Sequence, residues 1–208
     1  NNKIFEVGNI LREEIFNLDF KNHLDKFDVL KILVLGGSQG AKIFAEQFPQ
    51  IFERLKKDGV PIKIFQQCQK TQSEKLAAFF TKNKIDFEIF NFTDKITNYY
   101  SKVNLVITRS GASVLGELIN LRIPFISIPL PTSADNHQYK NAEFYQKKGY
   151  GYLIEEKDIK DKLFNLIKSI FNDNSLAINT ILKQKEYSDK AVFNNSYAQL
   201  KKTLNEKN

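Results

Sequence analysis

The sequence of 208 residues contains no methionine and no tryptophan, and it has one cysteine, five prolines and two histidines. A single cysteine, Cys68, excludes an internal disulfide framework and suits a reducing compartment. No apolar run approaches the ~20 residues that a membrane-spanning helix needs, and the polar start "NNKIFEVGNILREE" is unlike a signal peptide. Because even an initiator methionine is missing, we expect a fragment or one half of a longer protein.

The composition is that of a folded domain with a basic surface. Hydrophobic residues make up 42% of the chain and aromatic residues 12%, which suffices for one well-packed domain. The formal net charge is +7, but the lysines are spread over many predicted helices, and no nucleic-acid-binding motif accompanies them. Such a dispersed surplus indicates a solvated surface, so we expect no nucleic acid partner.

Short apolar runs alternate with helix-like segments along the chain. The runs are rich in Ile, Val and Phe and nearly continuous, which is typical of strands buried on both faces of a parallel sheet. The predicted strands are 31–35, 62–66, 87–90, 105–108, 124–128 and 150–154. The predicted helices are 43–57, 71–82, 95–101, 113–121, 138–148, 158–171, 175–186 and 189–204. This alternation predicts an α/β fold with a doubly wound, mostly parallel, Rossmann-like sheet of about six strands.

The first candidate site is the loop after the first predicted strand. Ligands of such sheets bind beyond the carboxyl ends of the strands, and this loop consists of Gly36, Gly37, Ser38, Gln39 and Gly40. Its glycines tolerate positive φ and let a ligand approach the backbone, while the following helix offers unpaired N–H groups and a positive dipole end. These features favour a phosphate or another compact anion.

Two alternatives to a phosphate-binding loop stay open at this point. A nicotinamide or flavin dinucleotide site has the spacing G-x-G-x-x-G and an acidic residue near the end of the second strand. This chain instead has G-G-x-x-G, and its second strand ends in "IFQQCQK" without an acid. The glycines could also serve only the tight packing of the strand against the helix.

A second loop, in "TRSGASVLGEL", places Ser110, Gly111 and Ser113 directly before an apolar-periodic helix. These are capping residue types, so a second helix N-terminus meets the same edge of the sheet. Two such N-termini favour a ligand with two adjacent negative groups, such as a diphosphate. Glu117 lies near the second turn of this helix, where it is either a solvated surface charge or a ligand for the hydroxyl pair of a ribose.

Two further loops carry polar residues at the same edge. The stretch "PLPTSADNHQYKNAEF" contains His137, Gln138 and Asn141. The amides of Gln138 and Asn141 can read sugar hydroxyls, or residues 135–136 can simply cap the helix, and no serine or cysteine motif pairs with His137 in a nucleophilic triad. In "IFNFTDKI", Thr93 precedes a helix whose backbone amides could pair with a flat base. No set of Asp, His and Cys has metal-ligand spacing, so we expect no metal and no cofactor.

The motifs taken together resemble a known family. The segments "GNILREE", "GGSQGA", "TRSGASVLGEL" and "IPLPTSADNHQYKNA" follow one another over essentially the whole chain, and they are similar to the carboxy-terminal half of the MurG family of peptidoglycan glycosyltransferases. The chain departs from that family at Ile10 and Leu11, where proline and valine are usual, and between Ser113 and Gly116. The resemblance implies one half of a GT-B glycosyltransferase, with residues 1–30 as an interdomain preamble and first helix and residues 31–208 as a UDP-sugar-binding domain.

The resemblance also implies a function and a set of binding residues. Enzymes of this family transfer N-acetylglucosamine from UDP-N-acetylglucosamine to a lipid-linked muramyl-pentapeptide. The residues implied to bind the donor are Arg12, Ser38, Thr93, Ala112, Ser113, Val114, Leu115, Gly116, Glu117 and Gln138. Arg12 and Ser38 would contact the nucleotide and Thr93 the uracil. Residues 112–116 would contact the diphosphate, Glu117 the ribose and Gln138 the N-acetylglucosamine.

The acceptor site, the general base and the membrane-docking patch belong to the amino-terminal domain of that family, which we expect to be absent from this chain. The resemblance therefore implies the donor-binding part of a peripheral protein on the cytoplasmic face of the bacterial inner membrane. Alone, this part would be poorly active. The alternatives are the donor subunit of another GT-B nucleotide-sugar transferase and a non-catalytic nucleotide-binding module.

Overall fold

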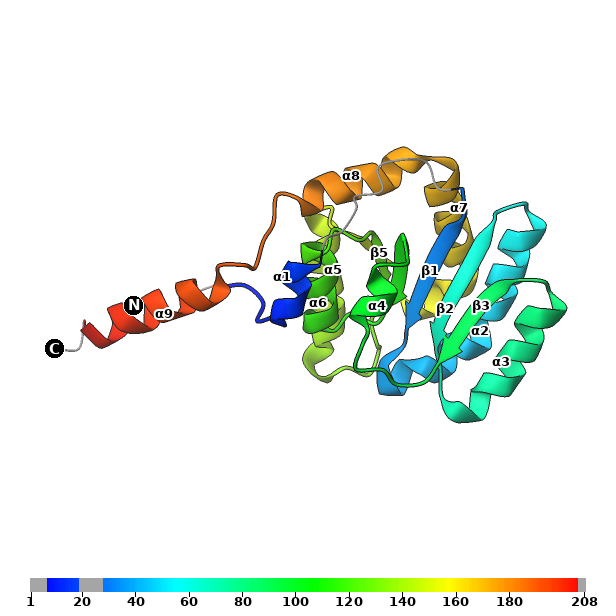
Figure 1. Cartoon of the computed structure of the whole chain (residues 1–208), viewed down its shortest axis with the longest axis horizontal. Coiled ribbons are helices and arrows are strands. Elements are labelled where there is room, and N and C mark those ends of the chain that lie inside the picture. Colours follow the sequence, from blue (N-terminus) through cyan, green and yellow to red (C-terminus); the bar gives the residue numbers. More distant parts are fainter. Residues whose placement is uncertain (1–6, 19–27, 206–208) are drawn as a thin grey trace.

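A six-stranded sheet in the order β3-β2-β1-β4-β5-β6 forms the centre of the molecule, and every neighbouring pair of strands is parallel (Figure 1). The computed structural model describes residues 7–18 and 28–205, without the side chains of residues 38–41 and 204–205. The strands are β1 Leu30–Leu35, β2 Ile62–Gln67, β3 Asp86–Phe90, β4 Leu105–Thr108, β5 Phe125–Ser127 and β6 Tyr152–Leu153. The predicted doubly wound, Rossmann-like sheet is confirmed.

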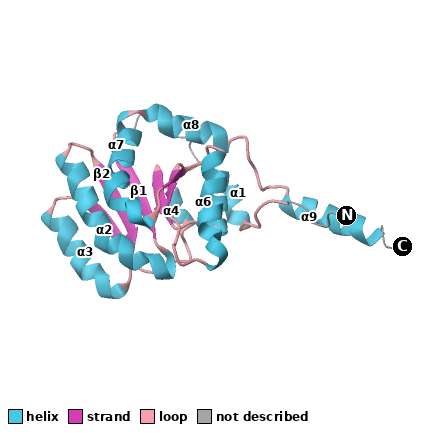
Figure 2. Ribbon diagram, turned by 180° about the vertical axis from the view of Figure 1, so that it is seen from behind, coloured by secondary structure: helices cyan, strands magenta, loops and turns pink. Residues whose placement is uncertain are grey.

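Helices connect the strands and cover both faces of the sheet (Figure 2). They are α1 Glu13–Asn17, α2 Gly37–Lys57, α3 Lys70–Lys82, α4 Thr97–Tyr100, α5 Ala112–Asn120, α6 His137–Lys147, α7 Phe164–Asn172, α8 Asn174–Gln184 and α9 Val192–Asn205. Short turns of other helical types lie at η1 Ala134–Asn136, η2 Glu156–Asp158 and η3 Ile159–Leu163. In both views α9 projects away from the sheet, and it exposes Phe193, Tyr197 and Leu200.

Two apolar clusters, one on each face, hold the helices on the sheet. Helices α2, α3 and α7 pack on the face that carries Ile32 and Val34, whereas α1, α4, α5 and α6 pack on the face that carries Leu33 and Leu35. Successive residues of a strand point to opposite faces, so all four of these positions of β1 are apolar. This explains why the buried strands read as continuous apolar runs rather than as alternating ones.

Some predicted boundaries were wrong, each for a local reason. Helix α2 begins at Gly37 rather than at residue 43, because the glycine-rich loop itself forms the first turn and the Gly37 N–H donates to Gln67 Oε1 at 3.2 Å. The predicted helix 158–171 is interrupted by a π-helical turn at Ile159–Leu163. The last helix begins at Val192 rather than at residue 189, because Asp189 forms hydrogen bonds to other parts of the chain.

Cys68 closes the edge of the sheet where β2 and β3 end. Its N–H donates to Phe90 O at 3.0 Å, and its carbonyl oxygen accepts from Asn91 Nδ2 at 3.0 Å. The thiol lies 3.5 Å from Ser73 Oγ and is buried in the cluster under α2 and α3. Cys68 is therefore a packed core residue.

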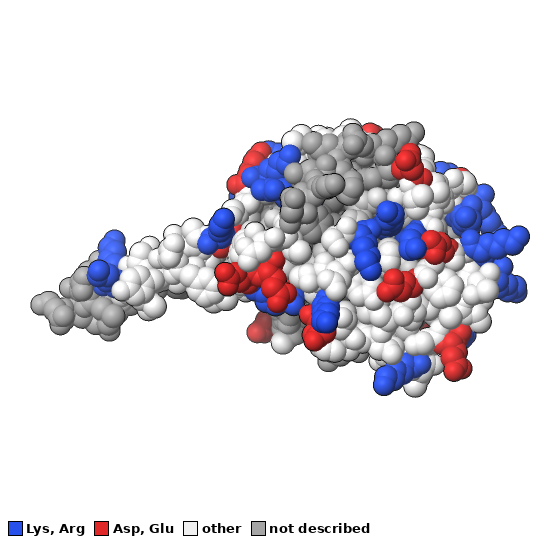
Figure 3. Space-filling view, in the orientation of Figure 1, with Lys and Arg blue, Asp and Glu red and all other residues white. Residues whose placement is uncertain are grey.

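Charged side chains of both signs lie interspersed on the face that Figure 3 shows. Neighbours one helical turn apart form ion pairs, such as Lys57 with Glu53 and Lys162 with Asp158. This arrangement fits the solvated surface that the dispersed lysines predicted. In the stretches 7–18 and 28–205, no helix is long and apolar enough to cross a membrane.

We predict that the aromatic stack of α2 carries much of the stability. The Phe48 ring lies 4.5 Å from the Phe44 ring and 5.9 Å from the Phe52 ring, between centroids. Phe48→Ala should lower the free energy of unfolding by about 3–5 kcal/mol, because it removes a buried ring and leaves a cavity. Phe193→Ala makes the same change at a residue that is 63% exposed and should cost less than about 0.5 kcal/mol. Urea titrations measure both losses, and equal losses would contradict this account of the core.

Candidate functional site

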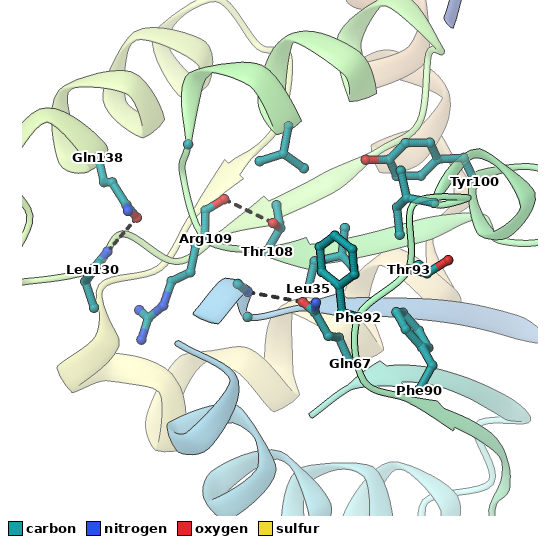
Figure 4. A pocket seen from close by; sticks show the side chains of 15 residues that line it. Leu35, Gln67, Phe90, Phe92, Thr93, Tyr100, Thr108, Arg109, Leu130 and Gln138 are labelled. Atoms are coloured by element: carbon teal, nitrogen blue, oxygen red, sulfur yellow. Dashed lines mark hydrogen bonds between the residues drawn. The ribbon is translucent and has the colours of Figure 1, made fainter. Parts of the chain in front are cut away.

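The chain reverses its direction of travel across the sheet at β1 and β4. From β1 it crosses by α2 to β2, whereas from β4 it crosses by α5 to β5. Because α2 and α5 pack on opposite faces, the loops that follow β1 and β4 separate and leave a crevice at the carboxyl edge. A pocket of about 390 Å³ lies in this crevice (Figure 4).

The pocket brings together the four loops that the sequence analysis singled out. They lie after β1, β3, β4 and β5, and they are far apart in the sequence. The predicted site residues that line the pocket are Gly36, Gly37, Thr93, Val114 and Gln138. The pocket is therefore formed by the strand ends of both halves of the sheet.

Helix α5 starts at the pocket with an open N-terminus. Its N-cap, Gly111, has an extended backbone and no side chain that could accept a hydrogen bond from the first turn. The N–H groups of residues 112–114 have no partner within the helix, so α5 presents unpaired donors and the positive end of its dipole. Leu115 N already donates to Gly111 O at 3.1 Å, and Leu115 and Gly116 are buried. These two residues therefore contribute to packing rather than to the open turn.

The glycine-rich loop forms the first turn of α2. Gly36 is the N-cap, and Gly37, with φ +61°, lines the pocket. A residue with a Cβ would be strained at that φ. The Gly37 N–H donates to Gln67 Oε1 at 3.2 Å (Figure 4). Residues 38–40 continue the helical turn, and their side chains lie outside the described part of the structure.

Glu117 is a buried acid on α5 that two other side chains hold. It is 8% exposed. Its Oε1 accepts from Arg12 Nη2 at 2.8 Å and from Arg12 Nε at 3.2 Å, and its Oε2 accepts from Tyr100 OH at 2.8 Å. The carboxylate raises the pKa of Arg12, and burial together with the carboxylate raises the pKa of Tyr100. The guanidinium thus stays charged and the phenol stays a donor. Of these three residues, Tyr100 lines the pocket, whereas Arg12 and Glu117 are not among its lining residues.

Gln138 joins two loops at the opposite side of the pocket. Its Oε1 accepts from Ser110 N at 3.2 Å and from Leu130 N at 3.0 Å (Figure 4). One turn later, Asn141 Nδ2 donates to Ser110 O at 3.1 Å. The start of α6 therefore fixes the loop before α5. The Gln138 NH₂ group makes no hydrogen bond to the described residues.

Arg109 is a buried cation that the sequence analysis did not single out. It lines the pocket directly after β4. Its guanidinium forms an ion pair with Glu156, donates to Ile128 O at 3.2 Å and to Pro129 O at 3.1 Å, and lies 4.6 Å from the centroid of the Phe44 ring. The signal that could have found it is a charge that directly follows a buried strand, because such a charge must be paired.

The loop after β3 supplies an apolar wall. Phe90, Phe92 and Ile96 line the pocket, and Phe92 is exposed beside it. Thr93 Oγ1 accepts from Lys95 N at 3.0 Å. Helix α4 begins only at Thr97, so Thr93 forms a turn ahead of this helix rather than its first position.

His137 lies exposed at the start of α6, with its Nδ1 2.8 Å from Ala134 O. The two residues before it, Asp135 and Asn136, have positive φ, and neither caps the helix with its side chain. Across the described residues, no three His, Cys, Asp or Glu side chains gather as ligands for a metal ion.

Comparisons with known proteins point to one family. Residues 31–199 match the family described as "Glycosyltransferase family 28 C-terminal domain". A protein of Pelagibacter ubique (strain HTCC1062) is 34% identical over 206 residues, which cover 99% of this chain and 57% of that protein. Its name is UDP-N-acetylglucosamine--N-acetylmuramyl-(pentapeptide) pyrophosphoryl-undecaprenol N-acetylglucosamine transferase. A protein of the same name from Rickettsia bellii (strain RML369-C) is 34% identical over 201 residues, which cover 93% of this chain and 56% of that protein.

The crystal structure of Acinetobacter baumannii MurG is similar in fold, with a TM-score of 0.74 and 24% identity over 89% of this chain and 53% of that one. The present chain spans a little more than half the length of the curated relatives it matches. Since the family match covers most of the chain, the predicted resemblance is confirmed, and the chain belongs to glycosyltransferase family 28, of which it carries the C-terminal domain.

Proposed function

We propose that this chain is the donor-binding half of a glycosyltransferase that transfers N-acetylglucosamine from UDP-N-acetylglucosamine to an undecaprenyl-linked muramyl-pentapeptide in peptidoglycan synthesis. The observation that carries the proposal is the pocket between β1 and β4, bordered by two helix N-termini whose N-caps are glycines. The names of the curated relatives that are 34% identical support it.

The diphosphate would lie between the N-termini of α2 and α5. Residues 112–114 would donate their backbone N–H groups, while Gly36 and Gly37 would let the ligand approach α2, with Ser38 beside it. Each helix dipole contributes about 0.3–1 kcal/mol to binding an anion, and more where the site is partly buried. The same donors would stabilise the negative charge that develops on UDP as it leaves.

The ribose would bind to Glu117. A carboxylate has about four lone-pair sites, and three of those of Glu117 are occupied by Arg12 and Tyr100. Two ribose hydroxyls need two sites, so a bidentate contact requires one of the present donors to move. Arg12, whose side chain is 43% exposed, is freer to move than the buried Tyr100. Arg12 donates twice to Oε1, so giving up its longer bond, from Nε at 3.2 Å, would free the second site, while the Nη2 bond at 2.8 Å keeps Arg12 against Glu117.

The base and the sugar would occupy opposite sides of the pocket, where Thr93 and Gln138 lie (Figure 4). The uracil would pack on the apolar wall that Phe90 and Phe92 form, and the backbone of Thr93 would pair with its polar edge. The Gln138 NH₂ group would donate to the N-acetylglucosamine, because its carbonyl oxygen is engaged by two backbone N–H groups.

The remaining steps of the reaction would fall to other parts of the whole protein. A general base there would activate the acceptor hydroxyl for inverting transfer. The lipid-linked acceptor would also bind there, at the cytoplasmic face of the bacterial inner membrane, with the enzyme as a peripheral protein. The chain described here would bind the donor and turn over little by itself.

We predict that the chain is selective for the UDP-sugar. UDP-N-acetylglucosamine should raise its melting temperature, because a ligand at about 100 times its Kd stabilises the folded state by about 2.7 kcal/mol. NAD and ATP at the same concentration should have little effect. A thermal-shift series compares the three. Equal shifts would favour a general nucleotide-binding module, and no shift with UDP-N-acetylglucosamine would contradict the proposal.

We predict that a new acid at the start of α5 stabilises the folded chain but weakens its binding of UDP. Ala112→Asp places a negative charge in the first turn, where the helix dipole stabilises it by about 0.3–1 kcal/mol. The same charge should repel a diphosphate and raise the Kd for UDP by about tenfold or more. Ala112→Asn is the neutral control of nearly the same size. Thermal melts and calorimetry measure the two effects, and undiminished UDP binding by Ala112→Asp would exclude the diphosphate from this helix.

If Glu117 binds the ribose, it should recognise the 2′ and 3′ hydroxyls of UDP. The chain should bind 2′,3′-dideoxy-UDP more weakly than UDP by about 1–3 kcal/mol, the value of a buried charged hydrogen bond. Glu117→Gln should bind both nucleotides about equally weakly in calorimetry. Glu88→Gln is a control for the loss of a carboxylate–tyrosine bond, because Glu88 also accepts from a tyrosine, Tyr99, at 2.8 Å but lies exposed on the edge strand β3. If Glu117→Gln still discriminates as the unmodified chain does, the ribose binds elsewhere.

A further inference from the structure

A buried polar cluster lies beside α5, outside the pocket; we call Asn9, Asn120, Tyr187 and Asp189 the Asp189 cluster. Asp189 lies between α8 and α9 and is 3% exposed. Its Oδ1 accepts from Asn9 N at 2.9 Å and from Tyr187 OH at 2.8 Å. Its Oδ2 accepts from Asn9 Nδ2 at 3.1 Å and from Asn120 Nδ2 at 2.8 Å. Four neutral donors thus hold a buried carboxylate, an arrangement that tolerates little displacement of any of them.

Further bonds make the cluster cooperative. Asp189 N donates back to Asn120 Oδ1 at 2.9 Å, so α5 is bound through both the main chain and the side chain of Asp189. Burial, together with the Asp189 carboxylate, raises the pKa of Tyr187 and keeps its hydroxyl a donor. Asn9 Nδ2 also donates to Tyr187 OH at 3.3 Å, and Tyr187 OH donates to Asp189 Oδ1; hydrogen bonds linked in such a chain strengthen one another.

Glycines let the N-terminal segment pass through the cluster at close range. Gly8 has φ +96°, and a Cβ at this position would collide with Asp189 Oδ1 and lie 2.7 Å from Val192 Cγ2. On α5, a Cβ at Gly116 would lie 3.0 Å from Asn9 Cγ. Glycine at both positions therefore permits the approach, and residues 8–9 are fixed between α5 and the connection to α9.

The same segment carries Arg12, three residues after Asn9. The Arg12 carbonyl oxygen accepts from Ile15 N at 3.1 Å at the start of α1, and its guanidinium reaches Glu117 Oε1 at 2.8 Å. Glu117 directly follows Gly116, against which Asn9 rests. The Arg12 side chain is 43% exposed, so packing against neighbouring residues does little to fix its position. The anchor at Asn9 sets the point from which Arg12 extends.

We propose that Asp189 is a positioning residue for donor binding: it holds Asn9 and, through residues 9–12, places Arg12 against Glu117. This inference rests on the proposed function, since it gives Asp189 an effect on UDP binding that passes through Glu117. Three segments far apart in the sequence, 8–12, 116–120 and 187–192, thereby act as one unit beside the donor pocket.

The test is a double-mutant cycle between Asp189 and Arg12, with UDP as the probe. Asp189→Asn keeps the size of the side chain but turns an NH₂ group toward the donors of the cluster. It should raise the Kd for UDP by about tenfold and lower the melting temperature. In the Arg12→Ala background the same substitution should leave the Kd unchanged and still lower the melting temperature. A merely structural role would not make the effect on the Kd depend on Arg12.

Two further variants complete the design. Gly8→Ala disturbs residues 8–9 from the other side and should give the same pattern, which keeps the inference testable if Asp189→Asn does not fold. Asp173→Ala removes the N-cap of α8, whose carboxylate accepts from Ser175 N at 3.0 Å. It should lower the melting temperature and leave the Kd for UDP unchanged.

The outcomes separate the two proposals. If the unmodified chain binds no UDP, the proposed function is wrong and the positioning role falls with it. If the unmodified chain binds UDP but Asp189→Asn raises the Kd equally with and without Arg12, or does not raise it at all, the proposed function stands and the positioning role is overturned.

Discussion

Strands β1 and β4 are paired side by side, and the chain leaves them toward opposite faces of the sheet. Because parallel neighbours end at the same edge, α2 and α5 both begin there and diverge from it. That divergence sets apart the two glycine N-caps, Gly36 and Gly111, and forms the walls of the pocket. The loops after β3 and β5 add side chains to a site whose place is decided by the order of the strands.

Two charged pairs, each with one buried member, lie at or beside this site and differ in what they hold. Arg109 and Glu156 form a pair inside the protein, and Arg109 also fixes the loop after β5 through two carbonyl oxygens. Glu117 and Arg12 form a pair with one exposed member, and the arginine comes from a distant segment. Removing one partner of a buried pair is far more destabilising than the pair is stabilising. The first pair therefore belongs to the framework, whereas the exposed Arg12 of the second pair has more room to move.

Much of the fold followed from local patterns in the sequence. β4 has the predicted bounds. The glycine loops were singled out because they directly follow strands, and Glu117 because it is an acid near the second turn of the helix after β4. The long-range pairs could not be found in this way: Arg12 and Glu117 are 105 positions apart, and Asn9 and Asp189 are 180 apart. The spacing of apolar residues predicts which side of a helix is buried. It does not predict which distant polar side chain will form a hydrogen bond with a residue of that helix. Similarly, the turn Ile159–Leu163 keeps an apolar spacing close to that of an α-helix, which hid the interruption before α7.

Cys68 follows Gln67, whose side chain accepts the Gly37 N–H at the pocket. The thiol is 3% exposed, so a thiol reagent reaches it only when the edge formed by β2 and β3 opens, and the rate of modification then measures that opening. A ligand that binds only the closed form lowers the open population by the factor 1 + [L]/Kd. The chain has no tryptophan that could report binding by its fluorescence. The rate at which a thiol reagent modifies the single cysteine can thus report how much of the pocket is occupied.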